Sequence, residues 1–252
     1  MAVRPRHRRG RGQHFLRSSK LAAELVRAAH VQPGDLVLDL GAGTGVLTRP
    51  LVRGGARVVA VEIDAYLAEV LRRRYPQVDV RLDDALRVPL PREPFKVVAN
   101  PPFGGATTIL RRLLDPVVPL TTADVIAQWG VAEKRAAVWP STQLGVYWGA
   151  WFELSVARRL PRCVFAPPPD VDAGLLRIAR RDEALVPVAE RRGYQAFLAR
   201  GFREGPGAVV SRKLLKRCET ELGFERRARA RDLDAWQWAE LYRHGLVRRP
   251  AP

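Results

Sequence analysis

A glycine-rich turn between a strand-like and a helix-like stretch constrains this chain more than any other feature. The apolar run Leu36–Leu40 leads into Asp39-Leu-Gly-Ala-Gly-Thr-Gly45, and the amphipathic run Val46–Val52 follows. Glycines permit a tight turn and let the backbone approach a ligand without a Cβ in the way. A helix start adds unpaired N–H groups and the positive end of the helix dipole. The stretch therefore predicts a strand, a turn and a helix, with a cofactor above the strand end.

The spacing of the glycines narrows the class of cofactor. The dinucleotide fingerprint needs a third glycine where Val46 stands, and no Lys-Ser or Lys-Thr follows as in a P-loop. Asp39 and Glu62, at the ends of two successive predicted strands, suit a ligand with a cationic amino-acid part and a ribose diol. S-adenosylmethionine (SAM) has both parts and no pyrophosphate. For this stretch taken alone, an ordinary turn of an α/β protein stays the alternative.

Strand and helix patterns alternate along the first 180 residues. Strands are expected at 36–40, 57–62, 78–82, 96–99 and 123–129, and helices at 19–29, 46–52, 65–75 and 107–114. This alternation predicts an α/β fold with a Rossmann-like, doubly wound, mostly parallel sheet. Residues 152–180 fit an antiparallel pair of strands at the sheet edge.

The sequence pattern changes after Arg181. Three arginine-rich helical patterns follow, at 190–203, 212–221 and 233–244. We therefore predict three parts: a disordered basic arm at 1–12, a SAM-binding catalytic domain at 13–181 and a helical RNA-binding domain at 182–252.

The charge of the chain points to a polyanionic partner. It has 43 Lys and Arg against 26 Asp and Glu, a formal net charge of +17. Nucleic acid is the first candidate and an anionic membrane surface the second. No apolar run is long enough for a transmembrane helix, and the N-terminus lacks the apolar core of a signal peptide, so we expect a cytoplasmic protein. Two isolated cysteines and four scattered histidines predict neither a disulfide framework nor a metal site.

A second motif, Asn100-Pro-Pro-Phe103, ends a predicted strand and suits the methylation of an aromatic amine. The lone pair of such an amine is delocalised into the ring. The side-chain oxygen of Asn100 and the carbonyl of Pro101 can both accept from the NH2 group, which favours a more nucleophilic nitrogen. Phe103 can stack on the base. A loop with two prolines is the alternative for these four residues alone. The glycine-rich turn, Glu62, Asp84 and this motif, however, all fall at successive strand ends of one sheet, which makes coincidence improbable.

Six segments of the chain carry a family resemblance. They are Gly12-Gln-His-Phe-Leu16, Asp39 to Gly45, Val61-Glu-Ile-Asp64, Asp84-Ala-Leu86, Asn100 to Phe103 and Phe165-Ala-Pro-Pro-Pro-Asp-Val-Asp172. Together, over about residues 12–181, they resemble the ribosomal RNA adenine N6-methyltransferase family, and most closely its Erm branch. That resemblance implies dimethylation of one adenine of 23S rRNA in the peptidyl-transferase loop region. It also implies resistance to macrolides, lincosamides and streptogramin B.

The resemblance also implies roles for individual residues. The implied cofactor-binding residues are Gln13, His14, Leu16, Gly41, Gly43, Glu62, Ile63, Asp84, Ala85 and Asn100, and the implied catalytic residues are Asn100, Pro101 and Phe103. Glu62 would hold the ribose hydroxyls, and Asp84 the adenine amine of the cofactor. His14 stands where the family has asparagine, and Pro102 where it has Ile or Leu. These departures leave open whether one methyl group or two are transferred.

Three other functions compete with this interpretation. A KsgA-type enzyme would dimethylate two adjacent adenines of 16S rRNA. A non-catalytic RNA-binding factor on the same scaffold would have lost the donor-site residues, yet Glu62, Asp84 and Asn100 are all present. A DNA adenine methyltransferase fits the segments at 12–16 and 165–172 less well. We expect a monomer, because no extended apolar surface stands out in the sequence.

Overall fold

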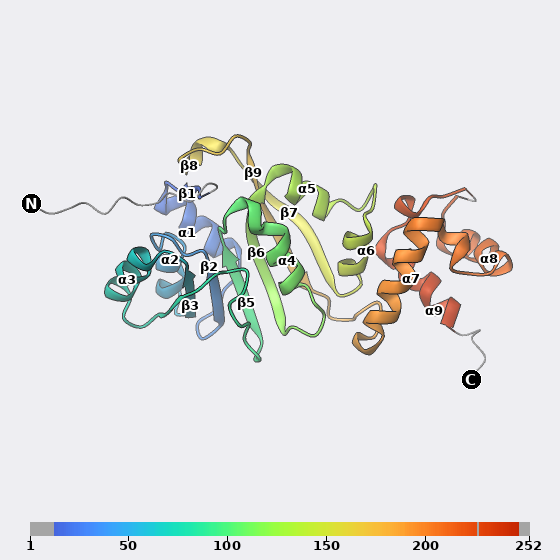
Figure 1. The fold of residues 1–252 in the computed structure, drawn as a ribbon, viewed down its shortest axis with the longest axis horizontal. Helices are drawn as coiled ribbons and strands as arrows, with labels where there is room; N and C mark the ends of the chain where they lie inside the picture. Colours follow the sequence, from blue (N-terminus) through green and yellow to red (C-terminus); the bar gives the residue numbers. More distant parts are fainter. Residues whose placement is uncertain (1–12, 226, 247–252) are drawn as a thin grey trace, which may run out of the picture.

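Helices cover both faces of one seven-stranded sheet, and a group of helices follows at one end (Figure 1). This computed structural model describes residues 13–225 and 227–246. The strands are β1 (Phe15–Leu16), β2 (Leu36–Leu40), β3 (Arg57–Glu62), β4 (Asp79–Leu82), β5 (Phe95–Ala99), β6 (Leu120–Gln128), β7 (Phe152–Leu160), β8 (Phe165–Ala166) and β9 (Ala173–Arg180). The helices are α1 (Ser19–Ala28), α2 (Thr48–Arg53), α3 (Ala65–Arg74), α4 (Ala106–Leu113), α5 (Trp129–Ala136), α6 (Gln143–Gly149), α7 (Arg191–Glu204), α8 (Arg212–Leu222) and α9 (Ala235–Leu246).

The order of the strands in the large sheet is β4-β3-β2-β5-β6-β9-β7. Strands β2 to β6 pair in parallel, whereas β9 runs antiparallel to both β6 and β7. The predicted Rossmann-like, mostly parallel sheet with an antiparallel edge is therefore confirmed. The chain moves outward from β2 to β4 and returns to the other side of β2 at β5. Ligands bind at such a reversal in doubly wound sheets, outside the carboxyl ends of the strands.

Alternation along the strands sends side chains to two separate hydrophobic clusters. On β2, Leu38 and Leu40 belong to the cluster that α4 covers. Val37 belongs to the opposite cluster, which α1, α2 and α3 cover. A strand that is buried on both faces needs a nearly continuous apolar run, which is why residues 36–40 are readable from sequence.

The C-terminal helices α7, α8 and α9 pack onto the sheet part through α6. Trp151 is almost fully buried, its ring lies 6.0 Å from that of Tyr194, and its indole N–H donates to the carbonyl of Val186 at 2.8 Å. Trp238 on α9 is also fully buried, whereas its neighbour Trp236 is 46% exposed. One hydrophobic cluster thus runs from the sheet into the helices on either side of Arg181. The boundary placed there stays a prediction, as does the basic arm at 1–12, which lies outside the described residues.

Several elements differ from expectation. Helix α2 begins at Thr48 instead of Val46, because the intervening residues complete the glycine-rich turn. Helices α5 and α6 and the short antiparallel pair β1–β8 were not predicted. No helix among the described residues is long and apolar enough to cross a membrane.

Candidate functional site

A cavity opens at the carboxyl ends of β2, β3, β4 and β5, where the strand order reverses. Fifteen residues line it: Gln13, His14, Phe15, Gly41, Val61, Glu62, Ile63, Asp83, Asp84, Ala85, Leu86, Asn100, Pro102, Gly105 and Ile109. Eight of the ten predicted cofactor-binding residues are among them. The structure therefore brings together, from five separate segments, most of what the sequence singled out.

Glu62, the last residue of β3, is held in one orientation by backbone donors. The side chain is 3% exposed. Its Oε2 accepts from the N–H of Gly43 at 2.7 Å, and its Oε1 accepts from the N–H of Asp64 at 2.9 Å. A carboxylate has about four acceptor positions, so each oxygen retains capacity for a further donor. The residue is thus preorganised to accept from two neighbouring hydroxyl groups.

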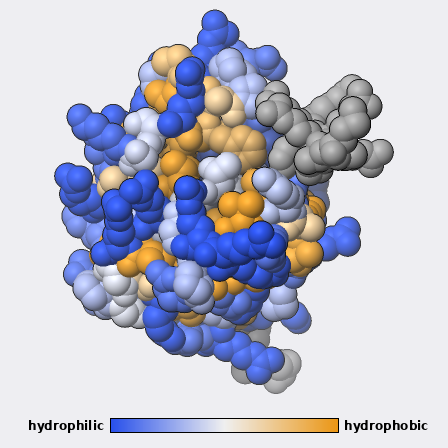
Figure 2. Space-filling view, turned by 90° about the vertical axis from the view of Figure 1, so that its left-hand side faces the viewer, coloured by the Kyte–Doolittle hydropathy of each residue, from blue (hydrophilic) through white to orange (hydrophobic). Residues whose placement is uncertain are grey.

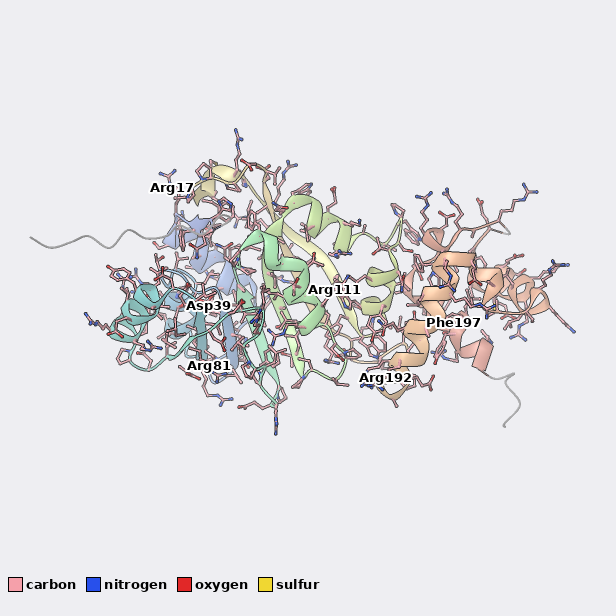
Figure 3. The ribbon with its side chains drawn as sticks, viewed as in Figure 1. Arg17, Asp39, Arg81, Arg111, Arg192 and Phe197 are labelled. Atoms are coloured by element: carbon pink, nitrogen blue, oxygen red, sulfur yellow. The ribbon has the colours of Figure 1, made fainter. Side chains whose placement is uncertain are left out.

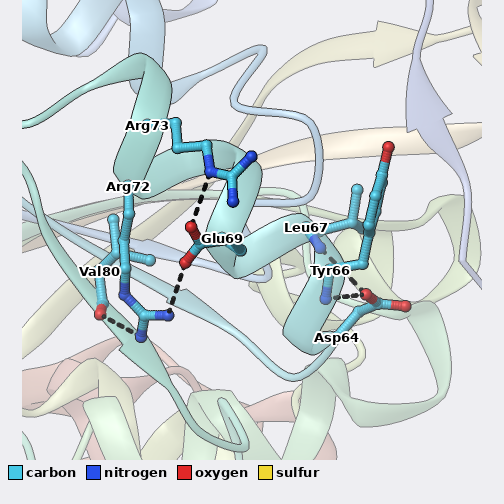
Figure 4. A network of polar contacts seen from close by, with 7 residues as sticks. All are labelled: Asp64, Tyr66, Leu67, Glu69, Arg72, Arg73 and Val80. Atoms are coloured by element: carbon cyan, nitrogen blue, oxygen red, sulfur yellow. Dashed lines mark hydrogen bonds and ion pairs between the residues drawn. The ribbon is translucent and has the colours of Figure 1, made fainter.

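Helix α3 fixes the turn that follows Glu62 (Figure 4). The carboxylate of Asp64 accepts from the N–H groups of Tyr66 and Leu67 at 2.9 and 3.0 Å, which confirms the prediction that Asp64 caps the helix. Farther along the helix, Arg72 donates to the carbonyl of Val80 on β4. The cap fixes the start of the helix next to β3, and the contact of Arg72 attaches the helix to β4. Both strands end at the cavity.

The glycines of the turn serve packing within the chain. Gly41 has φ +78°, and a Cβ there would lie 3.4 Å from the Cα of Pro101. Gly43 has φ +57°, and a Cβ there would lie 2.8 Å from the ring of Phe15. The space that the missing Cβ atoms leave is occupied by Pro101 and by Phe15 of β1, and the approach of these glycines to a cofactor stays a prediction. Gly41 still lines the cavity, whereas Gly43 contributes through its N–H to Glu62.

Asp39 lies behind the cavity and does not line it. Its side chain is 1% exposed, and its Oδ2 accepts from the hydroxyl of Thr48 at 2.7 Å (Figure 3 labels Asp39). The other oxygen, Oδ1, is buried without a hydrogen-bond partner among the described residues. Burial, with a smaller contribution from the nearby carboxylate of Glu62, raises the pKa of Asp39 to about 7. The position of Asp39 in the sequence had suggested contact with a cationic part of the ligand. In the structure, Asp39 does not line the cavity in which that ligand would lie.

One hydrogen bond orients the side-chain amide of Asn100, and the amide oxygen accepts no hydrogen bond from the described residues. Its Nδ2 donates to the carbonyl of His14 at 2.8 Å, which determines which way the amide faces. Its Oδ1 is buried and has no hydrogen-bond partner within the described part of the chain. A buried acceptor without a partner costs free energy and calls for an explanation, such as an absent ligand. This oxygen belongs to a residue that lines the cavity.

Residues 13–16 are held over the cavity by a distant segment. Strand β1 pairs antiparallel with β8, so that Phe15 lies opposite Ala166. The Nδ1 of His14 lies 2.9 Å from the carbonyl oxygen of Pro167. Residues 13–16 and the segment at 165–172, both singled out in the sequence, thus form one structure that positions the backbone contact to Asn100.

The loop after β4 is clamped by a residue that the sequence did not reveal. Arg112 on α4 donates to the carbonyls of Ala85 and Val88 at 3.0 and 2.5 Å. Within the loop, the Oδ1 of Asp84 accepts from the N–H of Leu86 at 2.8 Å. These contacts hold Asp84 and Ala85 at the cavity wall. Arg112 carried no signal because an arginine in an amphipathic helix ordinarily faces solvent.

Four predicted site residues do not line the cavity: Leu16, Gly43, Pro101 and Phe103. Leu16 is 4% exposed and belongs to the cluster beneath α1. Phe103 is 6% exposed, with its ring 5.2 Å from that of His14 and 5.9 Å from that of Phe165. The remaining lining residues were missed, although most are sequence neighbours of predicted ones.

Within the described residues, no group of three His, Cys, Asp or Glu side chains could hold a metal ion. The two cysteines are free: Cys163 is exposed and Cys218 is buried.

The model of the ribosomal RNA adenine dimethylase family matches residues 5–220. The chain belongs to this family. It is 36% identical over 209 residues to an rRNA adenine N-6-methyltransferase of Corynebacterium diphtheriae, covering 80% of this chain and 81% of that one. It is also 36% identical over 252 residues to the mycinamicin-resistance protein MyrB of Micromonospora griseorubida, covering 96% and 80%.

Two further members show the range of the family. A ribosomal RNA small subunit methyltransferase A of a Synechococcus species is 31% identical over 258 residues, covering 94% and 92% of the two chains. Among solved structures, the 23S rRNA methyltransferase ErmE matches with a TM-score of 0.82 and 28% identity, covering 91% of this chain and 98% of that one. Within this family, the chain thus resembles proteins named for both ribosomal subunits.

Proposed function

We propose that this chain transfers methyl groups from SAM to the N6 amine of one adenine in 23S rRNA, in the peptidyl-transferase loop region at the macrolide site. Methylation there would confer resistance to macrolides, lincosamides and streptogramin B. The observation that carries the proposal is the fixed, unpartnered Oδ1 of Asn100 beside the cavity. An enzyme that modifies an amine needs such an acceptor, placed where the amine will lie.

The residues present fit SAM. Glu62, oriented by two backbone donors, accepts from the ribose hydroxyls. Ile63 is 61% exposed although apolar, and it offers a flat contact for the adenine ring of the cofactor. Asp84 accepts from the amine of that ring, with Ala85 beside it, while Gln13 and His14 border the methionine part. When bound, SAM supplies a methyl group on a sulfonium, which is already a strong electrophile.

The chain's own contribution is to position the target adenine and to raise the nucleophilicity of its amine. The Oδ1 of Asn100 and the carbonyl of Pro101 accept from the two N6 hydrogens, which favours a pyramidal nitrogen with a free lone pair. Alignment of that lone pair with the methyl group supplies the remaining rate acceleration. The nitrogen then releases a proton to water, so no general base is required. Phe103 is covered by its neighbours in the structure, and stacking on the base requires that its ring be uncovered.

A 16S rRNA target in small-subunit biogenesis is the second candidate, favoured by the similarity to the small subunit methyltransferase of Synechococcus. The 23S target is preferred because ErmE, a 23S rRNA methyltransferase, shares the fold over 91% of the chain. Antibiotic resistance is supported by MyrB, a mycinamicin-resistance protein that matches over nearly the whole chain at higher identity. A non-catalytic RNA-binding factor is disfavoured because it would have no use for the free acceptor of Asn100. We further infer that the enzyme acts in the cytoplasm, where its substrate lies, and as a monomer.

The test is transfer of labelled methyl from SAM to protein-free 23S rRNA and, separately, to 16S rRNA in immature small subunits. Label in 23S rRNA as N6-methylated adenosine at the macrolide site is the expected result, and the same digest gives the ratio of mono- to dimethyl product. Label in 16S rRNA alone would transfer the assignment to the KsgA type and leave the chemistry unchanged. No label in either, with SAM still bound, would refute the proposed activity.

A further inference from the structure

A second hollow lies between α1 and α2, on the far side of the glycine-rich turn from the cavity. It encloses about 630 Å³. We name it the α1/α2 groove, and its charged lining residues are Lys20, Arg27, Arg49 and Arg53. No Asp or Glu lines it. The groove thus gathers four cations and no carboxylate in one hollow.

The helical spacing explains why these cations converge. Lys20 and Arg27 stand seven residues apart on α1, with Ala23 between them on the same face. Arg49 and Arg53 stand four residues apart on α2, also on one face. Seven residues of helix span roughly 10 Å, so the two cations of α1 lie too far apart to hold one phosphate between them. The arrangement suits a ligand with several successive negative charges.

None of the four cations makes an ion pair within the described part of the chain. On the neighbouring surface of α3, β3 and β4, by contrast, four basic side chains have an acidic partner: Arg57 pairs with Glu93, Arg72 and Arg73 with Glu69, and Arg81 with Asp79. Even the acidic residue of α1, Glu24, pairs with Arg158 on β7 instead of with a groove residue. The groove cations therefore remain available to an external anion.

Two short stretches of chain connect the groove with the candidate site. The chain runs from His14, which lines the cavity, through β1 to Lys20 in the groove within six positions. It also runs from Gly41 in the cavity to Val46 in the groove within five. Figure 2 views the molecule from the end that carries α1, α2 and α3, where hydrophilic side chains stand around smaller hydrophobic areas. An RNA strand that leaves the cavity along β1 would reach the groove next.

We propose that the α1/α2 groove is a second docking surface for the RNA substrate and holds phosphodiester groups that flank the methylated adenine. The inference rests on the proposed function, because it takes the polyanion to be RNA. No Phe, Tyr or Trp lines the groove, and the imidazole of His30 is its one aromatic ring, so it offers no extended platform on which bases could stack. Contacts limited to phosphates add affinity without reading sequence. The groove thus positions the RNA, while the cavity selects the base.

The experiment compares two quadruple variants with equal net charge. The groove variant carries Lys20→Gln, Arg27→Gln, Arg49→Gln and Arg53→Gln. The control variant carries Arg57→Gln, Arg72→Gln, Arg73→Gln and Arg81→Gln on the adjacent surface, where the cations are paired. Binding to protein-free 23S rRNA is measured across a salt series without SAM, together with circular dichroism, SAM affinity, and flotation on phosphatidylglycerol vesicles.

Each lost phosphate contact reduces the slope of log K against log salt by about 0.7 to 0.9. With four contacts removed, the groove variant is expected to lose about 2.8 to 3.6 from the slope and to bind at least tenfold more weakly at low salt, whereas the control stays close to the parent. Equal slopes for the two variants would overturn the proposal. So would loss of vesicle binding alone, which would make the partner a membrane.

The experiment distinguishes failure of the docking proposal from failure of the proposed methyltransferase activity. A slope difference without methyl transfer to any rRNA keeps the docking surface and removes the proposed activity. Methyl transfer by both variants at the parental rate and affinity removes the docking surface and keeps the activity.

Discussion

Replacing Asp39 by asparagine should remove a pH-dependent contribution to stability that the buried carboxyl makes. Asp39 is 1% exposed, one of its oxygens has no hydrogen-bond partner among the described residues, and its pKa is raised from 3.8 to about 7. Between pH 4 and 7, the folded protein therefore holds a proton that the unfolded chain has released. The stabilisation is fully present below pH 4 and is lost as the pH rises to about 7.

The magnitude follows from proton linkage. When the folded state binds one more proton than the unfolded state, the free energy of unfolding falls by about 1.36 kcal/mol per pH unit. Over about three pH units, this amounts to about 4 kcal/mol. Asparagine does not titrate, so the free energy of unfolding of Asp39→Asn, relative to that of the parent, should rise by about 3 to 4 kcal/mol from pH 4 to 7.

The assay is urea-induced unfolding of both proteins at half-unit steps from pH 4 to 8. Thr48→Val is the companion variant: it removes the hydroxyl that lowers the pKa of Asp39, and it should extend the falling limb above pH 7. A difference between Asp39→Asn and the parent that is constant across this range would refute the reasoning, because the carboxyl would then titrate alike in both states.

Two further predictions concern buried arginine contacts. Arg112→Met should weaken SAM binding about 10- to 100-fold, because the clamp on the carbonyls of Ala85 and Val88 is worth about 1.5 to 3 kcal/mol; an unchanged Kd by calorimetry would contradict this role. Arg177→Met should destabilise the fold by about 2 to 3 kcal/mol in urea, since it leaves the carboxylate of Asp124, 5% exposed, without its bidentate partner. This is less than the roughly 3 to 5 kcal/mol for breaking a fully buried pair, because Arg177 is a third exposed. Recovery of stability in the double variant with Asp124→Asn would support this cause.

The sheet could be predicted because its signals are local. Each of β2, β3 and β5 is a short, mostly apolar run with a polar residue at or beside its end, namely Asp39, Glu62 and Asn100, and a strand buried on two faces leaves few other interpretations. Asp64 likewise indicated the start of α3 locally, through the capping preference of its side chain. Strand ends of a parallel sheet lie along one edge, so the convergence of Glu62, Asp84 and Asn100 followed from topology.

The rest of the site depended on contacts between distant segments. His14 and Pro167 are 153 positions apart, and the strands that join them have two residues each, too short to show a period. The burial of Phe103 against His14 and Phe165 is equally invisible to local pattern. Helix α5 was missed for a different reason: it begins directly after the last residue of β6, so no turn residue marks the change.

Asn100 offers the most direct test of the central claim that a fixed acceptor receives the target amine. Single-turnover methyl transfer is measured for Asn100→Ala and the parent with saturating SAM and 23S rRNA, together with the Kd of SAM. Loss of the acceptor should lower the rate at least 100-fold while the Kd of SAM changes less than threefold, as for removal of one group that stabilises a transition state. Transfer by Asn100→Ala at a rate near that of the parent would contradict the account.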